Sequence, residues 1–220
     1  PDQRQPLYRQ ARYDGIDWIE INRGFLASYF PLNSPSIPEF KPSLLRSAKR
    51  ANGFRVICLG SSSMFGTPYD MNGNIPGILR KQLRKALPER EVEVLNLGAS
   101  AINSNVIRDF APLLPELQPD AVVIYMGHNE FYGPDGVGAS WVERKLGFPT
   151  EWKYELRKLR LFQLAAKLLT PSAAAAGTGE ANLMKQVSAG QLVSLESSDA
   201  RRVFGGFEEN LRGVITTFQE

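Results

Sequence analysis

Three consecutive serines, Ser61 to Ser63, stand directly after a short apolar run in the segment CLGSSSMFG. A serine at a turn from a strand into a helix presents its hydroxyl at the helix N-terminus, where backbone N–H groups favour developing negative charge. That position suits a nucleophile that attacks an ester carbonyl. It also suits an ordinary helix cap, because serine is a favoured N-cap residue. The triplet alone leaves both roles open.

Two further residues could complete a site around such a nucleophile. Gly98, in NLGAS, can offer an unobstructed backbone N–H, and Asn129, in GHNE, can offer a side-chain amide donor. A hydroxyl and two such donors on one crevice would form a nucleophile with an oxyanion hole, which stabilises the charged intermediate of acyl transfer. These residues together predict serine-dependent acyl-transfer chemistry.

Each of these turns follows an apolar, β-branched run that predicts a buried strand. The runs are FRVICLG from Phe54, VEVLNLG from Val92 and AVVIYMG from Ala121. Between them, residues 75–88 and 105–118 carry apolar residues at helical spacing. The alternation predicts an α/β fold with a parallel sheet covered on both faces. The polar turns then meet outside the carboxyl ends of the strands, where open α/β sheets bind ligands.

The three turns resemble the sequence blocks of the SGNH hydrolase superfamily, the GDSL-like esterases, lipases and acyltransferases. Residues 60–66, GSSSMFG, match the first block, G-D-S-x-x-x-G, and place the nucleophile at Ser62. The glycine of the second block falls on Gly98, and residues 127–130, GHNE, match the third block, G-x-N-D, in its GHNEF-type variant. The resemblance covers residues 53–133. It implies a three-layer α/β/α, flavodoxin-like fold whose members need no metal and no cofactor.

The sequence departs from the family pattern at the general base. The D-x-x-H block that supplies this base in the family does not occur, and His128 is the sole histidine. Without a base, a serine hydroxyl stays protonated and is a poor nucleophile. His128 could itself serve as the base, although its variable position in the third block favours a role in substrate contact. We interpret Glu130, in place of the aspartate of that block, as a second candidate substrate contact. Our hypothesis is that the domain is C-terminally incomplete, with the missing aspartate and histidine beyond Glu220.

The resulting prediction is a serine ester hydrolase or acyltransferase that acts on O-acyl groups of a sugar, a lipid or a cell-envelope ester. The alternative is a catalytically inactive module of the same fold that binds a glycan or a protein partner. Nucleotide binding is disfavoured because neither G-x-G-x-x-G nor G-x-x-x-x-G-K-[ST] follows the first strand. Nucleic acid is a poor partner, because 26 Lys+Arg against 23 Asp+Glu leave a charge of only +3.

Residues 1–52 are expected to form an extended N-terminal arm on the domain of residues 53–220. Four prolines in SYFPLNSPSIPEFKPS forbid long regular elements there. The aromatic residues of this arm could pin it to its own domain or anchor a protein partner. They are Tyr13, Trp18, Phe25, Tyr29, Phe30 and Phe40.

Residues 134–204 break the strand and helix pattern, and we interpret them as an insertion. It is either a lid over the strand ends or a segment that only packs on the sheet. The basic amphipathic stretch at residues 151–170 adds peripheral membrane contact as an alternative. The exposed edge of an incomplete sheet is a second candidate surface for a protein partner. The family resemblance further implies an extracytoplasmic, periplasmic or membrane-tethered location.

Overall fold

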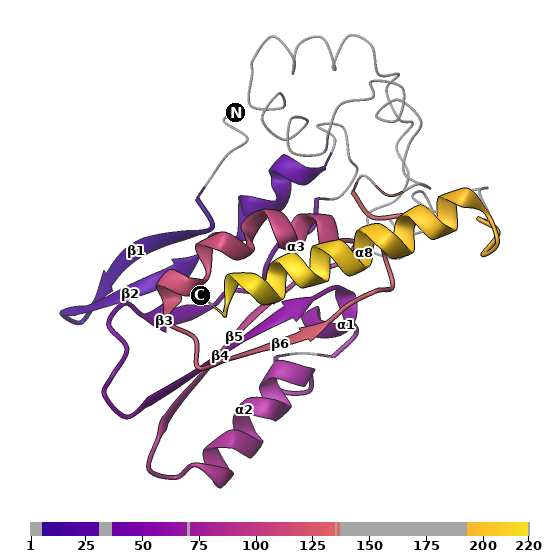
Figure 1. Ribbon diagram of the computed structural model, residues 1–220. Helices are drawn as coiled ribbons and strands as arrows, with labels where there is room; N and C mark the ends of the chain where they lie inside the picture. Colours follow the sequence, from indigo (N-terminus) through magenta and orange to yellow (C-terminus); the bar gives the residue numbers. More distant parts are fainter. Residues whose placement is uncertain (1–5, 31–36, 70, 135, 137–192, 220) are drawn as a thin grey trace, which may run out of the picture.

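The computed structural model describes residues 6–30, 37–69, 71–134, 136 and 193–219 (Figure 1). The described chain contains two sheets of three strands each, one parallel and one antiparallel. No helix among these residues is long and apolar enough to cross a lipid bilayer.

The parallel sheet is built from the three apolar runs of the sequence. Its strands are β4 (Gly53–Gly60), β5 (Glu91–Gly98) and β6 (Ala121–Tyr125), in the order β5-β4-β6. Gly60 pairs with Gly98 on one side and with Tyr125 on the other, so the three strands end at the same level. The predicted α/β class and the parallel pairing of these strands are confirmed.

Helices cover both faces of this sheet (Figure 1). On one face lies α2 (Ile75–Ala86), whose Leu79 and Leu83 pack toward Val56 and Cys58 of the central strand. On the other face lie α3 (Ser104–Phe110) and α8 (Ser198–Thr217), which contact each other. Successive side chains of β4 alternate between these two cores, as the pleat of a strand requires.

The structure differs from the expected end of one helix and places another helix across the expected end of the insertion. The helix expected over residues 105–118 ends at Phe110 and continues as two short 3₁₀ turns, Ala111–Leu113 and Pro115–Leu117. Each turn has a proline near its start, and proline lacks the N–H that an α-helix needs. The helix α8 starts at Ser198, where the side chain of Ser197 accepts the N–H of Ala200, so the expected end of the insertion at residue 204 falls inside this helix.

The other part of that insertion, residues 137–192, lies outside the described residues. The basic stretch at residues 151–170 belongs to it. The expectations of a lid and of membrane contact at this stretch therefore stay predictions.

The N-terminal arm is not merely extended, which corrects the expectation from its prolines. It forms an antiparallel sheet of β1 (Tyr8–Tyr13), β2 (Ile16–Ile21) and β3 (Leu44–Arg46), with a 3₁₀ helix at Arg23–Tyr29. All four prolines fall between that helix and β3, so they leave the hairpin free to form. Asp14 and Gly15 join β1 to β2 with φ of 51° and 74°, the left-handed geometry of a type I′ turn.

Four of the six aromatic residues of the arm are buried in the core that it shares with the α/β domain, whereas Tyr13 is exposed. Phe25 and Phe40 meet the ring of Phe110 edge to face, at centroid distances of 5.9 and 6.0 Å. Tyr29 donates a hydrogen bond of 2.5 Å to Asp109 of α3. Phe25, Tyr29, Phe30 and Phe40 are all buried, which supports the interpretation that they pin the arm to its own domain.

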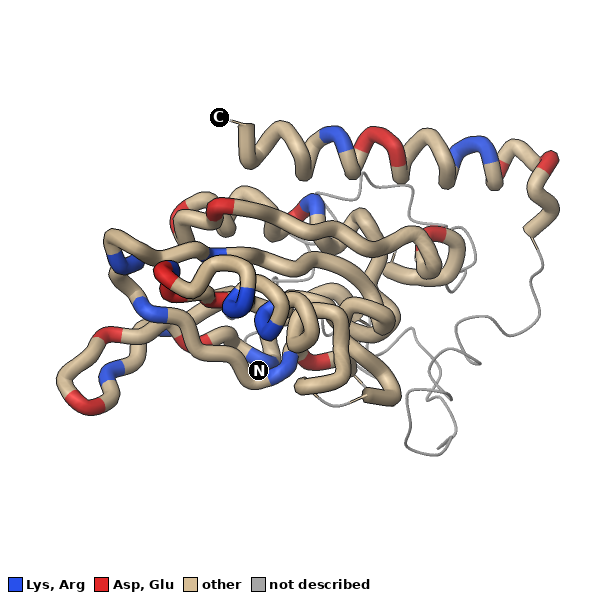
Figure 2. Tube along the Cα trace, turned by 90° about the horizontal axis from the view of Figure 1, so that it is seen from below, with Lys and Arg blue, Asp and Glu red and all other residues tan. Residues whose placement is uncertain are grey.

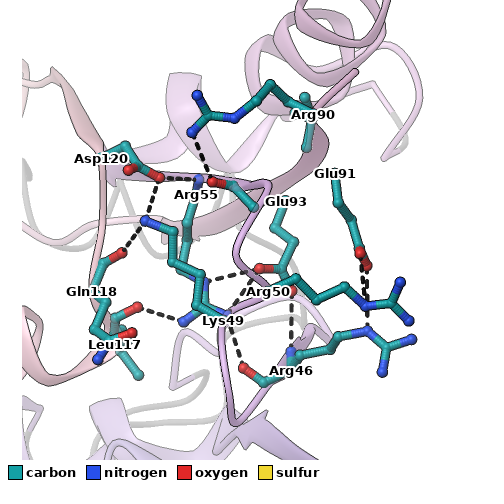
Figure 3. Close-up of polar contacts among 12 residues, drawn as sticks. Arg46, Lys49, Arg50, Arg55, Arg90, Glu91, Glu93, Leu117, Gln118 and Asp120 are labelled. Carbon is teal, nitrogen blue, oxygen red and sulfur yellow. Dashed lines mark hydrogen bonds and ion pairs between the residues drawn. The ribbon is translucent and has the colours of Figure 1, made fainter. Parts of the chain in front are cut away.

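A buried arginine connects the two sheets through hydrogen bonds (Figure 3). Arg55 of β4 is 1% exposed and donates two hydrogen bonds, of 3.0 and 2.9 Å, to Glu93 of β5. It also donates to the carbonyl oxygen of Arg46 in β3, at 2.8 Å, and to that of Leu117. A charge taken out of water needs such a full set of partners. Arg55 therefore fastens β3 to the parallel sheet.

Candidate active site

Ser62 is the first residue of a short helix directly after the central strand. This helix, α1, spans Ser62–Phe65, and Ser61 takes its N-cap position with an extended backbone, φ −92° and ψ −153°. The Ser61 hydroxyl oxygen makes no cap hydrogen bond and is buried without a partner. Ser62 is half-buried, and its hydroxyl bonds to no described residue. Ser61 does not cap the helix with its side chain, and within the described part of the chain the Ser62 hydroxyl is uncommitted.

The backbone at the end of β5 is in close contact with the backbone of α1. A Cβ atom added at Gly98 would stand 2.5 Å from the backbone nitrogen of Phe65 and 2.7 Å from the carbonyl carbon of Met64. Only a residue without a side chain allows these two backbones to approach so closely. Gly98 therefore sets the position of the helix that carries Ser62.

The N–H of Gly98 is not free for an oxyanion. It donates a hydrogen bond of 2.9 Å to the side-chain oxygen of Asn96, whose amide nitrogen in turn donates to the carbonyl oxygen of Met64 at 3.1 Å. In this arrangement Gly98 acts as a spacer, and the oxyanion role expected for its N–H is not supported.

Asn129 joins the loop after β6 to the loop after β5. Its side chain is 2% exposed, and its amide nitrogen donates a hydrogen bond of 2.9 Å to the carbonyl oxygen of Ile102. A primary amide carries two N–H groups, so one remains after this bond. The structure thus brings the three strand-end loops together, with one donor of Asn129 occupied in holding them.

His128 is exposed at the same end of the sheet. Its ring meets the ring of Tyr125 edge to face, at a centroid distance of 5.5 Å. It forms no hydrogen bond with Ser62 in the described part of the chain, so the geometry offers no support for His128 as a base. A substrate contact at His128 stays a prediction.

The expected contact between Glu130 and a substrate is not supported. Glu130 is 8% exposed, and its carboxylate accepts hydrogen bonds from the backbone N–H and the hydroxyl of Ser104, at 3.0 and 2.6 Å. Burial raises the pKa of the Glu130 carboxyl, and the hydrogen bonds from Ser104 oppose that shift. The Glu130 side chain caps the start of α3, where both of its oxygens accept hydrogen bonds from Ser104.

The backbone of Ala101 is a feature that the sequence did not reveal. Ala101 is 3% exposed in the loop after β5 and has a φ of 60°, a left-handed conformation uncommon for alanine. Its N–H donates to no acceptor among the described residues. A buried N–H without an acceptor is rare, and this one lies on the loop that Asn129 holds. No residue type in ASAIN signals such a conformation.

Comparisons with protein-family models, curated proteins and solved structures found no match for this chain. Within the described ranges, no group of three or more His, Cys, Asp and Glu side chains is placed to hold a metal ion. The assignment of a function therefore depends on the residues and geometry of the chain itself.

Proposed function

We propose that this chain carries the nucleophile of a serine ester hydrolase or acyltransferase with a flavodoxin-like SGNH fold. The observation that carries the proposal is the uncommitted hydroxyl of Ser62, at the first position of α1 and directly after the central strand. The strand order β5-β4-β6 is second, first, third along the chain. The same arrangement begins the flavodoxin-like order 2-1-3-4-5, which supports the fold assignment.

The proposed reaction is acyl transfer through a covalent intermediate. A general base takes the proton of the Ser62 hydroxyl while its oxygen attacks the ester carbonyl. The bond to the alcohol then breaks, the alcohol leaves with that proton, and the acyl group stays on Ser62. Water or a second alcohol attacks this ester in the same way, which restores the serine.

The donors for the oxyanion differ from those expected. The N–H of Ser62, at the start of α1, and the N–H of Ala101 have no acceptors among the described residues, and Asn129 retains one amide hydrogen. The general base is the part that the sequence does not supply, apart from His128. The family resemblance assigns it to a D-x-x-H block.

The second candidate is a catalytically inactive module that binds a glycan or a protein. It is favoured by the engagement of the Gly98 N–H with Asn96 and of the Asn129 amide with Ile102, since both groups then serve the fold. For either function we propose an ester or glycan ligand at the strand ends and an extracytoplasmic location.

Labelling by a fluorophosphonate, followed by intact mass and peptide mapping, tests the proposed reaction in the protein at its native length. We expect one adduct, on Ser62, that is lost in Ser62→Ala. Ser63→Ala, which removes the next hydroxyl of the same helix, is the matched control and should label like the parent protein. No adduct on the parent, or an adduct on another residue, would support the inactive module.

A further inference from the structure

The amino end of α2 exposes large apolar side chains on the surface. Tyr69, Met71, Ile75 and Ile78 are 65%, 45%, 41% and 48% exposed, and we call these four residues the α2 tip. Single exposed apolar residues are common on protein surfaces, whereas a contiguous group indicates a contact surface. All four residues fall within ten positions of the chain, on the loop before α2 and its first turn.

The remainder of α2 is cationic. It carries Arg80, Lys81, Arg84 and Lys85 and no acidic residue. None of the four forms an ion pair with a described residue, although Lys81 and Arg84 reach the carbonyl oxygens of Asn72 and Val92. By contrast, acidic and basic residues alternate along α8, the long helix at the top of Figure 2.

The apolar and cationic groups share the outward face of the helix. Ile78, Lys81 and Lys85 are spaced i, i+3 and i+7, so they lie along one side. Leu79 and Leu83 occupy the opposite side and pack into the core below. The outward face is therefore apolar at its amino end and positively charged toward its carboxyl end.

We propose that α2 and its tip dock this chain on an anionic lipid surface. Apolar side chains that enter the acyl boundary, beside lysines and arginines at the headgroups, are the combination that peripheral membrane contacts use. A second copy of the chain would bring the same cations, Lys81 and Lys85, against this face. Nucleic acid would satisfy the cations and leave exposed isoleucine and methionine without an apolar contact.

The α2 tip is tied to the helix that carries Ser62. The side chain of Asn74 donates to the carbonyl oxygen of Phe65 in α1, at 3.2 Å, and accepts the N–H of Gly77 in α2, at 2.8 Å. Docking through α2 thus brings α1 close to the lipid surface. On the separate assumption that Ser62 is the nucleophile, this orientation favours esters that reside in the membrane.

Vesicle flotation with the full chain tests the docking directly. We expect binding to vesicles that contain phosphatidylglycerol, weak binding to phosphatidylcholine alone, and release as added salt screens the cations. Because each basic residue near such a surface raises affinity about five-fold, the double variant Lys81→Gln/Lys85→Gln should lose about 25-fold. Ile78→Ser should also weaken binding, since its apolar side chain enters the acyl boundary.

The matched control variants remove the same kinds of side chain from exposed sites outside α2 and its tip. Arg12→Gln/Arg201→Gln removes the same charge from exposed sites on β1 and α8, and Leu195→Ser removes an apolar side chain that is 70% exposed. Both controls should bind within about two-fold of the parent, which corresponds to about 0.4 kcal/mol of binding free energy. Absence of binding to anionic vesicles, or equal losses in the controls, would overturn the proposal. So would self-association through this face, seen as a dimer that Ile78→Ser dissociates. All of these readouts are independent of catalysis by Ser62.

Discussion

Glu130 links three elements through one buried carboxylate. It accepts hydrogen bonds from the N–H and hydroxyl of Ser104, and Asn210 of α8 donates to the same hydroxyl at 2.9 Å. Arg108 of α3 completes the contact by donating to Asn210, also at 2.9 Å. The loop after β6, the start of α3 and the middle of α8 are thus held by a single chain of hydrogen bonds.

The protonation of Glu130 should make the stability of this junction depend on pH. Its pKa in the folded state lies above the ordinary value of 4.5, because burial disfavours the ionised form. The folded state therefore holds the proton more tightly, and this stability is complete below pH 4.5 and is lost as the pH rises through the folded pKa. Relative to Glu130→Gln, which does not titrate, the parent should lose at most about 1.4 kcal/mol of unfolding free energy per pH unit in that window.

Urea unfolding of both proteins from acidic to neutral pH measures this difference. Glu208→Gln is a control for loss of a carboxylate on the exposed side of α8. A difference between the parent and Glu130→Gln that stays constant with pH, or grows in favour of the parent, would contradict the prediction.

Local sequence signals place Ser62 at the turn between a strand and a helix, and the structure has it there, whereas the partners of its neighbours could not be predicted. A strand followed by a polar turn and a helix is read from adjacent residues, and Ser62 stands where that pattern places it. The bonds of Asn129 and Glu130 depend on Ile102 and Ser104, residues that come close only when two loops meet. Residue type reports what a side chain can donate or accept, but not which partner it finds.

At the scale of elements, the short helix α1 is positioned by its neighbours. It has only four residues, too few for a stable helix by itself. Its backbone lies against Gly98 at the end of β5, and the Asn96 side chain binds the carbonyl oxygen of Met64 within it. The position of Ser62 is therefore determined by contacts with β5 as well as by its own helix.

Gly98→Ala should displace α1. The added methyl would lie within 2.7 Å of backbone atoms of Met64 and Phe65, which cannot rotate away as a side chain can. We expect a loss of about 1–3 kcal/mol in unfolding free energy from overpacking. Phosphonate labelling of Ser62 should fall as well, because the hydroxyl moves with the helix. Denaturant unfolding and the labelling rate measure the two effects.

A glycine with open space around the position of a Cβ atom provides the control for this substitution. Gly205 lies in α8, and nothing stands within 4 Å of an added Cβ atom there. Gly205→Ala should therefore stabilise the protein by about 0.5–1 kcal/mol, since alanine favours a helix interior. A Gly98→Ala protein as stable as the parent would refute the role of Gly98 as a spacer.

An element could be predicted when the residues that define it are close together in the sequence. The parallel strands follow from contiguous apolar runs, and α2 from a periodic one that begins at the Asn74 cap. The hairpin of β1 and β2 carries a local signal, Asp14-Gly15 between two strand-like segments, but the prolines after residue 30 led us to expect an extended arm throughout residues 1–52. The pairing of β2 with β3 has no local signal, because more than twenty residues separate these strands.

At the scale of the whole molecule, the two sheets share one hydrophobic core. Residues of the arm, such as Leu26 and Phe40, belong to the same buried cluster as Ile57 and Leu97 of the parallel sheet. Arg55 adds a polar connection between β3, β4 and β5 (Figure 3). The described part of residues 1–52 is therefore a structural part of the α/β domain.

This shared core predicts that a substitution in the arm destabilises the entire fold. Phe40 is 1% exposed, stacks on Phe25 and meets Phe110 edge to face, so Phe40→Ala should lower the unfolding free energy by about 3–5 kcal/mol. Tyr13→Ala, at the exposed tip of the hairpin, should change it by less than about 0.5 kcal/mol. Denaturant unfolding should show a single transition in both variants, because the arm and the parallel sheet unfold together. If the arm only rested on a self-sufficient domain, Phe40→Ala would open the arm to trypsin while the main transition kept its midpoint, and the joint core would be disproved.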